Sequence, residues 1–217
     1  MDYLLGVAGL PWEIPPGSNI LLSGDLFSGK EFLSRDFIIE GLKNDEACIL
    51  ISTNETAEKI VENLGKVNLD NLCIVDCVSS KFGSTIEQPF SEQIRYVESP
   101  MDLTMIMVAL NDFLNVLSNE RKIKKIRIVL DSVSTLLMYS NLRTVFKFLH
   151  ILTTRIRSTG GSNIMLMEER AHDDIEIRTV RQLAQGIINM ETNTIQIKGF
   201  KTAQAQYELN ENKIIIK

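Results

Sequence analysis

The sequence lacks any run of about eighteen apolar residues, the length that a membrane-spanning helix needs. Its first residues also lack the basic and then apolar order of a signal peptide, so we expect a cytoplasmic protein without a membrane span. With 44% hydrophobic and 24% charged residues, the composition is that of an ordinary globular protein. A length of 217 residues leaves room for one domain, and we predict a single domain over residues 1–217.

Cysteine is scarce, and acidic residues outnumber basic ones. The three cysteines, Cys48, Cys73 and Cys77, are odd in number and lack paired metal-ligand spacing. They lie in or beside apolar runs, so we expect buried free thiols. The net charge of −5 argues against nucleic acid as a partner. The one basic run, residues 121–127, is typical of a solvated helix end and strand entry.

The clearest motif is a phosphate-binding loop, Gly-Asp-Leu-Phe-Ser-Gly-Lys, at residues 24–30. It lies between the apolar run 20–23 and an amphipathic segment that begins at residue 32, the order of strand, glycine loop and helix that such a loop requires. Loop amides and the helix N-terminus attract phosphate oxygens, and Lys30 can reach the β- and γ-phosphates. The residues predicted to contact a nucleotide are Gly24, Asp25, Leu26, Phe27, Ser28, Gly29, Lys30, Glu31 and Phe32.

One part of this loop is missing. Ser or Thr normally follows the lysine and ligates the Mg²⁺ that accompanies the nucleotide, but this chain has Glu31. Two like charges ~4 Å apart cost about 4 kcal/mol at an effective dielectric constant of about 20, so Glu31 is unfavourable beside phosphate unless a cation separates them. Adjacent helix positions point in different directions, and we therefore expect Lys30 not to neutralise Glu31. The alternative is a structural glycine turn in which Glu31 stabilises the helix dipole.

A second chemical signal comes about a hundred residues later. The apolar run 126–130 predicts a buried strand, and Asp131 follows directly. A carboxylate at the carboxyl end of such a strand can hold Mg²⁺ or its waters beside a phosphate loop, so Asp131 and Glu31 are candidate Mg²⁺ ligands. An Asp that merely starts a turn is the structural alternative.

The remaining chain alternates strand and helix. Strands are predicted at 20–23, 47–52, 72–75, 126–130 and 163–167, with helices at 56–64, 102–118 and 142–157 between them. This order predicts an α/β fold with a largely parallel sheet and helices on both faces. The short runs 186–190, 194–199, 205–209 and 213–216 predict an antiparallel extension, whereas a stretch with Gly83 and Pro89 is too irregular to assign.

The loop from Glu168 to Asp174 follows the last predicted parallel strand, at the sheet edge where ligands gather. It contains His172, one of the two histidines. A lone histidine in an acidic loop is typical of a solvated side chain, and a metal site is the weaker alternative.

The order of elements resembles that of the RecA-like ATPases, and most closely the KaiC-like branch. Segments 6–10 and 14–18 are similar to the lead-in of that family, 185–188 to its Asp-Gly-Val-Ile segment, and 130–134 to its strand-ending Asp-Ser segment. The resemblance implies a RecA-like P-loop fold, ATP or ADP as the cofactor with Mg²⁺, and a homo-oligomer, such as a ring of six, or a partner protein.

The sequence departs from the family at positions that carry out the family's ATP hydrolysis. Segment 50–56 matches the place where the family has two adjacent glutamates, the first of which polarises the attacking water; here Asn54 takes that position and Glu55 the second. Lys198 and Gly199 fall where a Lys-x-Arg-Gly group reaches the γ-phosphate of a neighbouring subunit, so Lys198 and Lys201 are candidate trans-acting cations. An amide can position a water but cannot accept its proton.

Three hypotheses therefore remain open. The chain is a nucleotide-binding regulatory or scaffold protein of the KaiC-like type with weak or no hydrolysis; or an active Mg²⁺-dependent ATPase with a shifted metal site, in which Glu55 is the base; or an interaction module that no longer binds nucleotide. Intact Gly24, Gly29, Lys30 and Asp131 favour the first.

Overall fold

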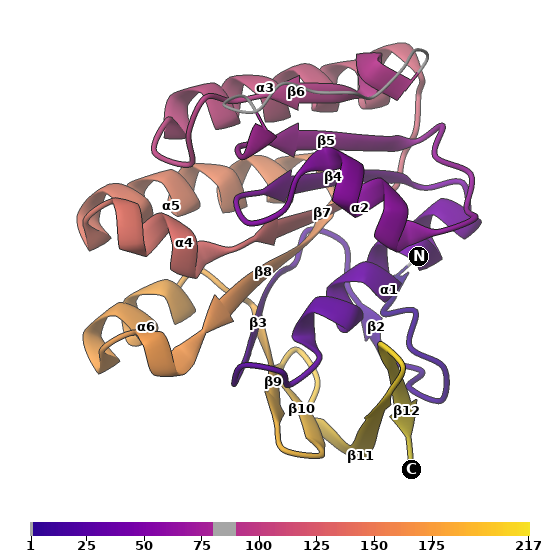
Figure 1. Cartoon of the computed structure of the whole chain (residues 1–217), viewed down its shortest axis with the longest axis vertical. Helices are drawn as coiled ribbons and strands as arrows, with labels where there is room; N and C mark the ends of the chain where they lie inside the picture. The colour runs from indigo at the N-terminus through magenta and orange to yellow at the C-terminus, as the bar shows by residue number, and fades with distance from the viewer. Residues whose placement is uncertain (1, 80–89) are drawn as a thin grey trace.

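A computed structural model describes residues 2–79 and 90–217 (Figure 1). Through them runs a ten-stranded sheet in the order β12-β11-β10-β9-β3-β8-β7-β4-β5-β6. Each pairing from β9 to β6 is parallel, and β10 to β12 extend the sheet as an antiparallel meander. The predicted α/β class, with its parallel sheet and antiparallel extension, is confirmed. The irregular stretch with Gly83 and Pro89 lies outside the described residues.

The parallel strands are β3 (Asn19–Gly24), β4 (Ala47–Ser52), β5 (Leu72–Asp76), β6 (Ile94–Tyr96), β7 (Ile126–Asp131), β8 (Ser162–Glu168) and β9 (Gly186–Glu191). The antiparallel strands are β10 (Thr194–Gly199), β11 (Ala203–Asn210) and β12 (Lys213–Ile216). Helices α1 (Lys30–Lys43) and α2 (Ala57–Leu64) cover one face of the sheet. Helices α3 (Leu103–Asn115), α4 (Val133–Tyr139), α5 (Leu142–Thr159) and α6 (Asp174–Arg181) lie on the other (Figure 1).

The predicted strands and long helices all appear within a few residues of their predicted bounds. The short elements were missed: β1 (Tyr3–Leu4) and β2 (Glu13–Ile14), which form a separate ribbon, as well as β6, α4 and α6. Elements this short carry too few residues to show a hydrophobic period. The helix predicted over 102–118 ends earlier, since α3 stops at Asn115 and a wider π-type turn, Val116–Glu120, follows. No described helix is long and apolar enough to span a membrane.

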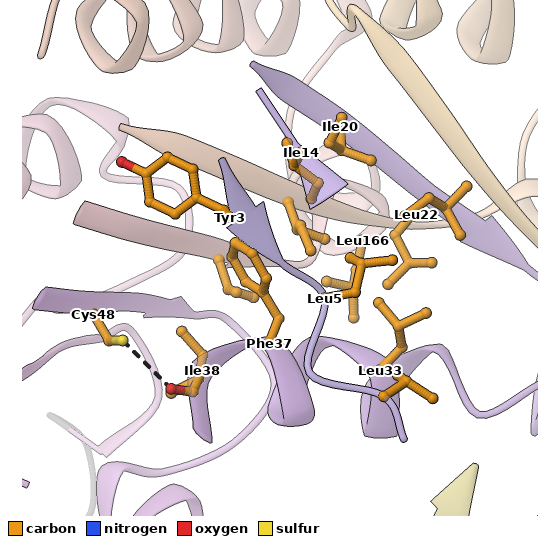
Figure 2. Packing of buried hydrophobic residues seen from close by; sticks show 14 of the residues in the cluster. Tyr3, Leu5, Ile14, Ile20, Leu22, Leu33, Phe37, Ile38, Cys48 and Leu166 are labelled. Carbon is orange, nitrogen blue, oxygen red and sulfur yellow. Dashed lines mark hydrogen bonds between the residues drawn. The ribbon is translucent and has the colours of Figure 1, made fainter. Parts of the chain in front are cut away.

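Two hydrophobic clusters hold the sheet between its helix layers. On the α1 side, Leu33 and Phe37 lie four residues apart on one helix face and point at the sheet residues Leu22 and Leu166 (Figure 2). The ribbon of β1 and β2 closes this side of the core. The cluster on the other face is built from α3, α4 and α5.

The three cysteines are free and buried, as predicted. Cys48 donates a weak hydrogen bond to the Ile38 carbonyl oxygen, with 3.5 Å between sulfur and oxygen (Figure 2). Burial raises the pKa of Cys48 far above its ordinary value and raises the pKa of Cys73 and of Cys77 to about 12. All three therefore remain protonated thiols at neutral pH.

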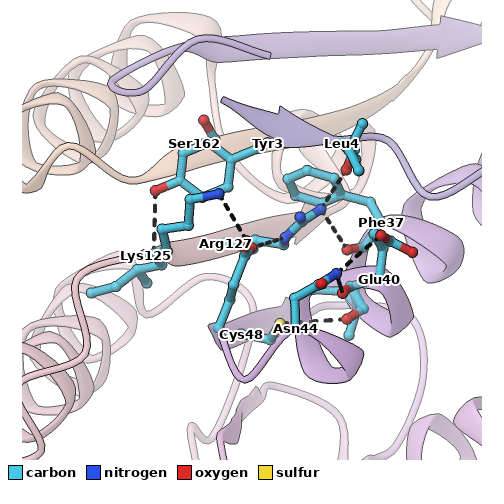
Figure 3. A network of polar contacts seen from close by, with 12 residues as sticks. Tyr3, Leu4, Phe37, Glu40, Asn44, Cys48, Lys125, Arg127 and Ser162 are labelled. Carbon is cyan, nitrogen blue, oxygen red and sulfur yellow. Dashed lines mark hydrogen bonds and ion pairs between the residues drawn. The ribbon is translucent and has the colours of Figure 1, made fainter. Parts of the chain in front are cut away.

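Arg127 corrects the prediction that the basic run is solvated. Its side chain is only 1% exposed, and its Nε lies 2.6 Å from a Glu46 carboxylate oxygen. One terminal nitrogen also donates to the Leu4 and Phe37 carbonyl oxygens, at 2.6 and 3.0 Å (Figure 3). Lys125 contacts the other Glu46 oxygen at 3.1 Å. This buried network joins β7, α1 and the N-terminal ribbon at the amino-terminal edge of the sheet.

We predict that Glu46→Gln lowers the free energy of unfolding by about 3 kcal/mol, because it leaves a buried guanidinium without its counter-charge. Urea denaturation measures this change. Glu62→Gln, which breaks the exposed pair between Lys59 and Glu62, serves as the control and should cost less than about 1 kcal/mol. Equal effects of the two substitutions would contradict the role assigned to Arg127.

Candidate functional site

The carboxyl ends of four neighbouring parallel strands meet at one edge of the sheet. Gly24 of β3 pairs with Glu168 of β8, and Ser52 of β4 pairs with Asp131 of β7. A cavity of about 710 Å³ opens at this edge, lined by residues of α1, α2 and α4 and by the ends of β4, β7 and β8. This volume lies within the usual range of small-molecule sites.

Two glycines permit the loop between β3 and α1. Gly29 has a φ of 86°, and a Cβ added there would lie 2.5 Å from Leu209 Cδ2. A Cβ on Gly24 would collide with the Met190 carbonyl oxygen and the Ser28 hydroxyl. Only glycine fits at either position, so the loop path depends on both residues.

The N-terminus of α1 differs from those of the other described α-helices. Thr56, Asp102, Ser132, Asn141 and Asp173 cap the five other helices, each through a side-chain oxygen that accepts an amide hydrogen bond. Helix α1 begins after Gly29 and has no side-chain cap. Its first amides, which border the cavity at Lys30 and Glu31, are therefore available to an anion.

Lys30 is only 2% exposed and is surrounded by oxygen atoms. Its Nζ forms ion pairs with Glu168 and, at 2.9 Å, with Glu31, and it donates to the Asp25 carbonyl oxygen at 3.2 Å. Burial alone would lower the pKa of Lys30, but the hydrogen bonds to Glu168 and Glu31 outweigh it and raise the pKa. The expectation that Lys30 does not neutralise Glu31 is therefore wrong, since the long lysine side chain bends back to meet the next residue.

The other predicted loop residues differ in exposure. Asp25 forms an ion pair with Arg170 at 2.8 Å, and the backbone at Phe27 is left-handed, with its side chain 89% exposed. Leu26 is also exposed, and Phe32 lies under the guanidinium of Arg35.

The Ser28 hydroxyl oxygen is buried and has no hydrogen-bond partner among the described residues. Such an oxygen is costly to leave unpaired, which makes the loop a candidate binding surface for a polar ligand.

Tyr207 on β11 contacts the phosphate-binding loop from the antiparallel extension of the sheet. Its buried hydroxyl lies 2.6 Å from the Ser28 carbonyl oxygen and 3.0 Å from that of Glu191. Burial raises the pKa of Tyr207 to about 12, so the hydroxyl remains a donor at neutral pH. Together with the contact of Leu209 on Gly29, this bond fixes the loop against the antiparallel extension.

The structure brings Asn54 and Asp131 together. Asn54 Nδ2 donates to an Asp131 carboxylate oxygen at 3.0 Å, and the Thr135 hydroxyl donates to Asn54 Oδ1 at 2.5 Å. Glu55 also borders the cavity, where its carboxylate accepts a hydrogen bond from Asn63 at 3.3 Å. The polar side chains at the ends of β4 and β7 therefore form one connected group.

Asp131 is the site carboxyl with the largest resolved change in pKa. Burial raises its pKa from 3.8 to about 6; the Asn54 hydrogen bond opposes this shift, the charges of Glu31 and Glu55 add to it, and Lys30 lowers it. Glu31 and Asp131, the two candidate Mg²⁺ ligands, are thus close enough to repel one another. The described residues contain no preassembled group of three His, Cys, Asp or Glu side chains for a metal.

Lys198 and Lys201 are not brought to this site. Lys198 pairs with Ile187 of β9, which in turn pairs with Leu21, three residues before the end of β3. Both lysines are exposed and follow β10 away from the loop of the same chain. Neither lysine lines the cavity of its own chain.

The predicted site residues did not include Glu168, Ser134 or His172, although the loop that begins at Glu168 was expected at the edge of the sheet where ligands gather. Glu168 follows the apolar strand β8 as Asp131 follows β7, and that repeated pattern was the available signal. The expectation that His172 is solvated is wrong, because its side chain is almost buried. Its Nε2 lies 2.8 Å from the Ser134 hydroxyl oxygen and its Nδ1 lies 3.2 Å from a Glu176 carboxylate oxygen. These contacts come from helices that local periodicity did not reveal.

Comparisons with known proteins give one matching family model and a similar solved structure. A family model described as "Family of unknown function (DUF7504)" matches residues 17–190. The crystal structure of the KaiC-like protein PH0186, from the hyperthermophilic archaeon Pyrococcus horikoshii OT3, superposes with a TM-score of 0.69 at 16% identity and covers 100% of this chain and 99% of that one. No curated protein matches the sequence significantly. The chain thus has a RecA-like, KaiC-like fold.

We predict that Asp131→Asn stabilises the protein at pH 8 by about 1–2 kcal/mol, because it removes a carboxylate whose ionisation the fold disfavours. The folded pKa of about 6 exceeds the ordinary 3.8, so the folded wild type holds this proton more tightly and loses stability as pH rises through that interval. The gain should shrink as pH falls toward 4. Urea denaturation at several pH values measures it, with the exposed Asp112→Asn as the control. A gain independent of pH would refute the assignment.

Proposed function

We propose that this chain, which belongs to the family of unknown function DUF7504, binds ATP or ADP at the edge formed by Gly24–Glu31 and hydrolyses it weakly or not at all. Its role on this proposal is that of a regulatory or scaffold protein whose state depends on the nucleotide. The adenine base is inferred from the resemblance to RecA-like ATPases, and the phosphate site from the residues themselves.

The observation that carries the proposal is the uncapped N-terminus of α1 at the cavity. The five other described α-helices each satisfy an early amide with their own side chain, whereas α1 leaves its amides to the loop and the cavity. A phosphate group is the ligand that such amides, the helix dipole and a neighbouring lysine attract together. The buried hydroxyl of Ser28, which has no partner among the described residues, would gain one.

Lys30 would bind the β- and γ-phosphates, and to do so it must exchange carboxylate oxygens for phosphate oxygens. Glu168 and Glu31 compete for the same ammonium group, so part of the binding energy is used to displace them. Mg²⁺, which would supply charge neutralisation between phosphate oxygens, has Asp131 and Glu31 as its candidate ligands. We therefore expect nucleotide affinity below that of loops with Ser or Thr after the lysine.

Weak hydrolysis follows from the residues at four positions. Asn54 holds Asp131 and can orient a water, but its amide cannot accept a proton. Glu31 replaces the metal-binding hydroxyl, and Lys198 and Lys201 provide charge only between molecules. Phosphoryl transfer depends on all of these parts acting together, so the losses reinforce one another.

The orientation of Lys198 and Lys201 away from their own loop supports assembly into a homo-oligomer, such as a ring of six, in which each pair reaches the site of a neighbour. A partner protein in place of the neighbour is the other arrangement consistent with these exposed lysines. The net charge of −5 remains an argument against nucleic acid, and we place the protein in the cytoplasm.

An active Mg²⁺-dependent ATPase is the second candidate, and the raised pKa of Asp131 favours it. Burial is the main cause of that shift and the charges of Glu31 and Glu55 add to it; a divalent cation held by Glu31 and Asp131 would relieve the repulsion between those two carboxylates. Glu55 would then serve as the base. This candidate requires a carboxylate in place of the usual hydroxyl as a metal ligand.

We predict that ATP and ADP bind to the wild type and that Lys30→Ala weakens binding by at least about tenfold, because the loop loses its only buried cation. Isothermal titration calorimetry with each nucleotide, with and without Mg²⁺, measures the dissociation constants. Lys43→Ala, at the exposed far end of the same helix, is the matched control and should bind like the wild type. No binding by the wild type at millimolar nucleotide would leave the third hypothesis, an interaction module.

We predict that Glu31→Thr tightens Mg²⁺·ATP binding by about tenfold, because it removes a carboxylate that repels phosphate and supplies a metal-binding hydroxyl. Glu168→Gln, which removes the other competitor for Lys30, should also tighten it. The exposed Glu62→Thr is the control for the loss of one negative charge. If Glu31→Thr instead weakens Mg²⁺-dependent binding, Glu31 is a metal ligand and the ATPase candidate is favoured.

A further inference from the structure

A hydroxyl, an imidazole and a carboxylate form a hydrogen-bonded chain beside the phosphate site. Ser134 Oγ lies 2.8 Å from Nε2 of His172, and Nδ1 of His172 lies 3.2 Å from a carboxylate oxygen of Glu176. The residues come from α4, the loop after β8, and α6, so three separate segments converge on the imidazole. The proposed function makes no use of this group.

The contacts select the tautomer of the histidine. The Glu168 amide donates to Ser134 Oγ at 2.9 Å, which leaves the Ser134 hydroxyl proton free to point at Nε2. Because a carboxylate only accepts hydrogen bonds, a neutral His172 must donate from Nδ1 to Glu176, and Nε2 then accepts the Ser134 hydroxyl proton. A serine oriented toward a neutral imidazole that a carboxylate holds in place is the arrangement by which proteins prepare a hydroxyl to give up its proton.

The hydrogen-bonded series of Ser134, His172 and Glu176 reaches the cavity beside Lys30. Ser134 lines the cavity together with Lys30 and Glu168. The residue whose amide binds Ser134 Oγ is the one whose carboxylate pairs with Lys30 Nζ, so the hydroxyl and the ammonium group border the same end of the cavity. A phosphate held by Lys30 would therefore have the Ser134 hydroxyl near it.

The other candidate bases at the site are already engaged. Asn54 cannot accept a proton, and the Glu168 carboxylate is paired with Lys30. Glu55 accepts a hydrogen bond from Asn63 on α2. Among the groups that line the cavity in the described part of the chain, Ser134 is the one hydrogen-bonded to an imidazole.

We propose that Ser134 and His172 form the proton relay of the residual nucleoside triphosphate hydrolysis, an inference that rests on the proposed function. Ser134 Oγ accepts a proton from the attacking water and passes its own hydroxyl proton to Nε2 of His172. The water oxygen bonds to the γ-phosphorus while the bond from that phosphorus to the bridging oxygen breaks, giving the nucleoside diphosphate and inorganic phosphate. Glu176 holds the imidazolium until it returns the proton to solvent.

The first test determines the tautomer of His172 in the absence of nucleotide. Nitrogen-15 NMR of the labelled protein at pH 8 distinguishes a protonated Nδ1 from a protonated Nε2. The chain has two histidines, so His150→Gln assigns the His172 signals. We expect protonated Nδ1 and unprotonated Nε2, and Ser134→Ala should shift the Nε2 resonance. The opposite tautomer would overturn the relay whatever the nucleotide does.

The second test measures turnover and affinity separately. Single-turnover hydrolysis of γ-labelled ATP should fall about a hundredfold in His172→Gln and in Ser134→Ala, while the dissociation constant for ADP stays within about twofold. Added imidazole should restore part of the turnover of His172→Ala, which a purely structural role would not allow. His150→Gln, on the exposed face of α5, is the matched control and should hydrolyse like the wild type.

The outcomes separate this inference from the proposed function. Nucleotide binding without turnover, or turnover unaffected in His172→Gln, overturns the relay and leaves nucleotide binding intact. Loss of turnover in Glu168→Gln but not in His172→Gln assigns the base to Glu168 and also overturns it. Failure of the wild type to bind nucleotide overturns both. If His172→Gln does not fold, Glu176→Gln replaces it, because the Glu176 side chain is partly exposed, and should lose about tenfold in turnover.

Discussion

A nearly buried ammonium group must be surrounded by oxygen, and at Lys30 this requirement organises the whole edge of the sheet. Its partners come from the end of β8, the first turn of α1 and the loop backbone at Asp25. Burying a lone charge in protein is costly, so these three segments must come together whenever the lysine occupies its position. The same requirement places Glu168 at the site. Its amide donates to Ser134, which in turn contacts His172. The chemistry at this edge is thus arranged around one cation.

The local order of strand, loop and helix was predictable because its signals lie within a few residues of one another. Continuous apolar runs separated by helical segments predicted β3, β4, β5, β7 and β8, and the glycine spacing predicted the loop. The partner choices were not predictable. Nothing near Arg127 indicates that Glu46 will neutralise it, and nothing near His172 indicates that Ser134, thirty-eight residues earlier, will bind it. Such contacts depend on the packing of whole elements, which a single sequence does not display.

Lys30 and Glu31 illustrate the same limit at the shortest range. Helix geometry correctly says that adjacent side chains leave the helix in different directions, yet the two charged ends meet at 2.9 Å. The lysine has four methylenes with which to turn, and the burial of its ammonium group makes an ion pair worth forming. The direction in which a side chain leaves the backbone therefore did not determine where its charge lies.

The bond from Tyr207 to the Ser28 carbonyl oxygen joins residues 179 positions apart. During synthesis on a ribosome, the loop emerges long before the strand that supports it. Until β11 has left the exit tunnel and paired with β10, the loop lacks both the tyrosine hydroxyl and the contact of Leu209 on Gly29. A nascent chain can therefore contain the complete loop sequence and still lack the two contacts by which β11 supports the loop.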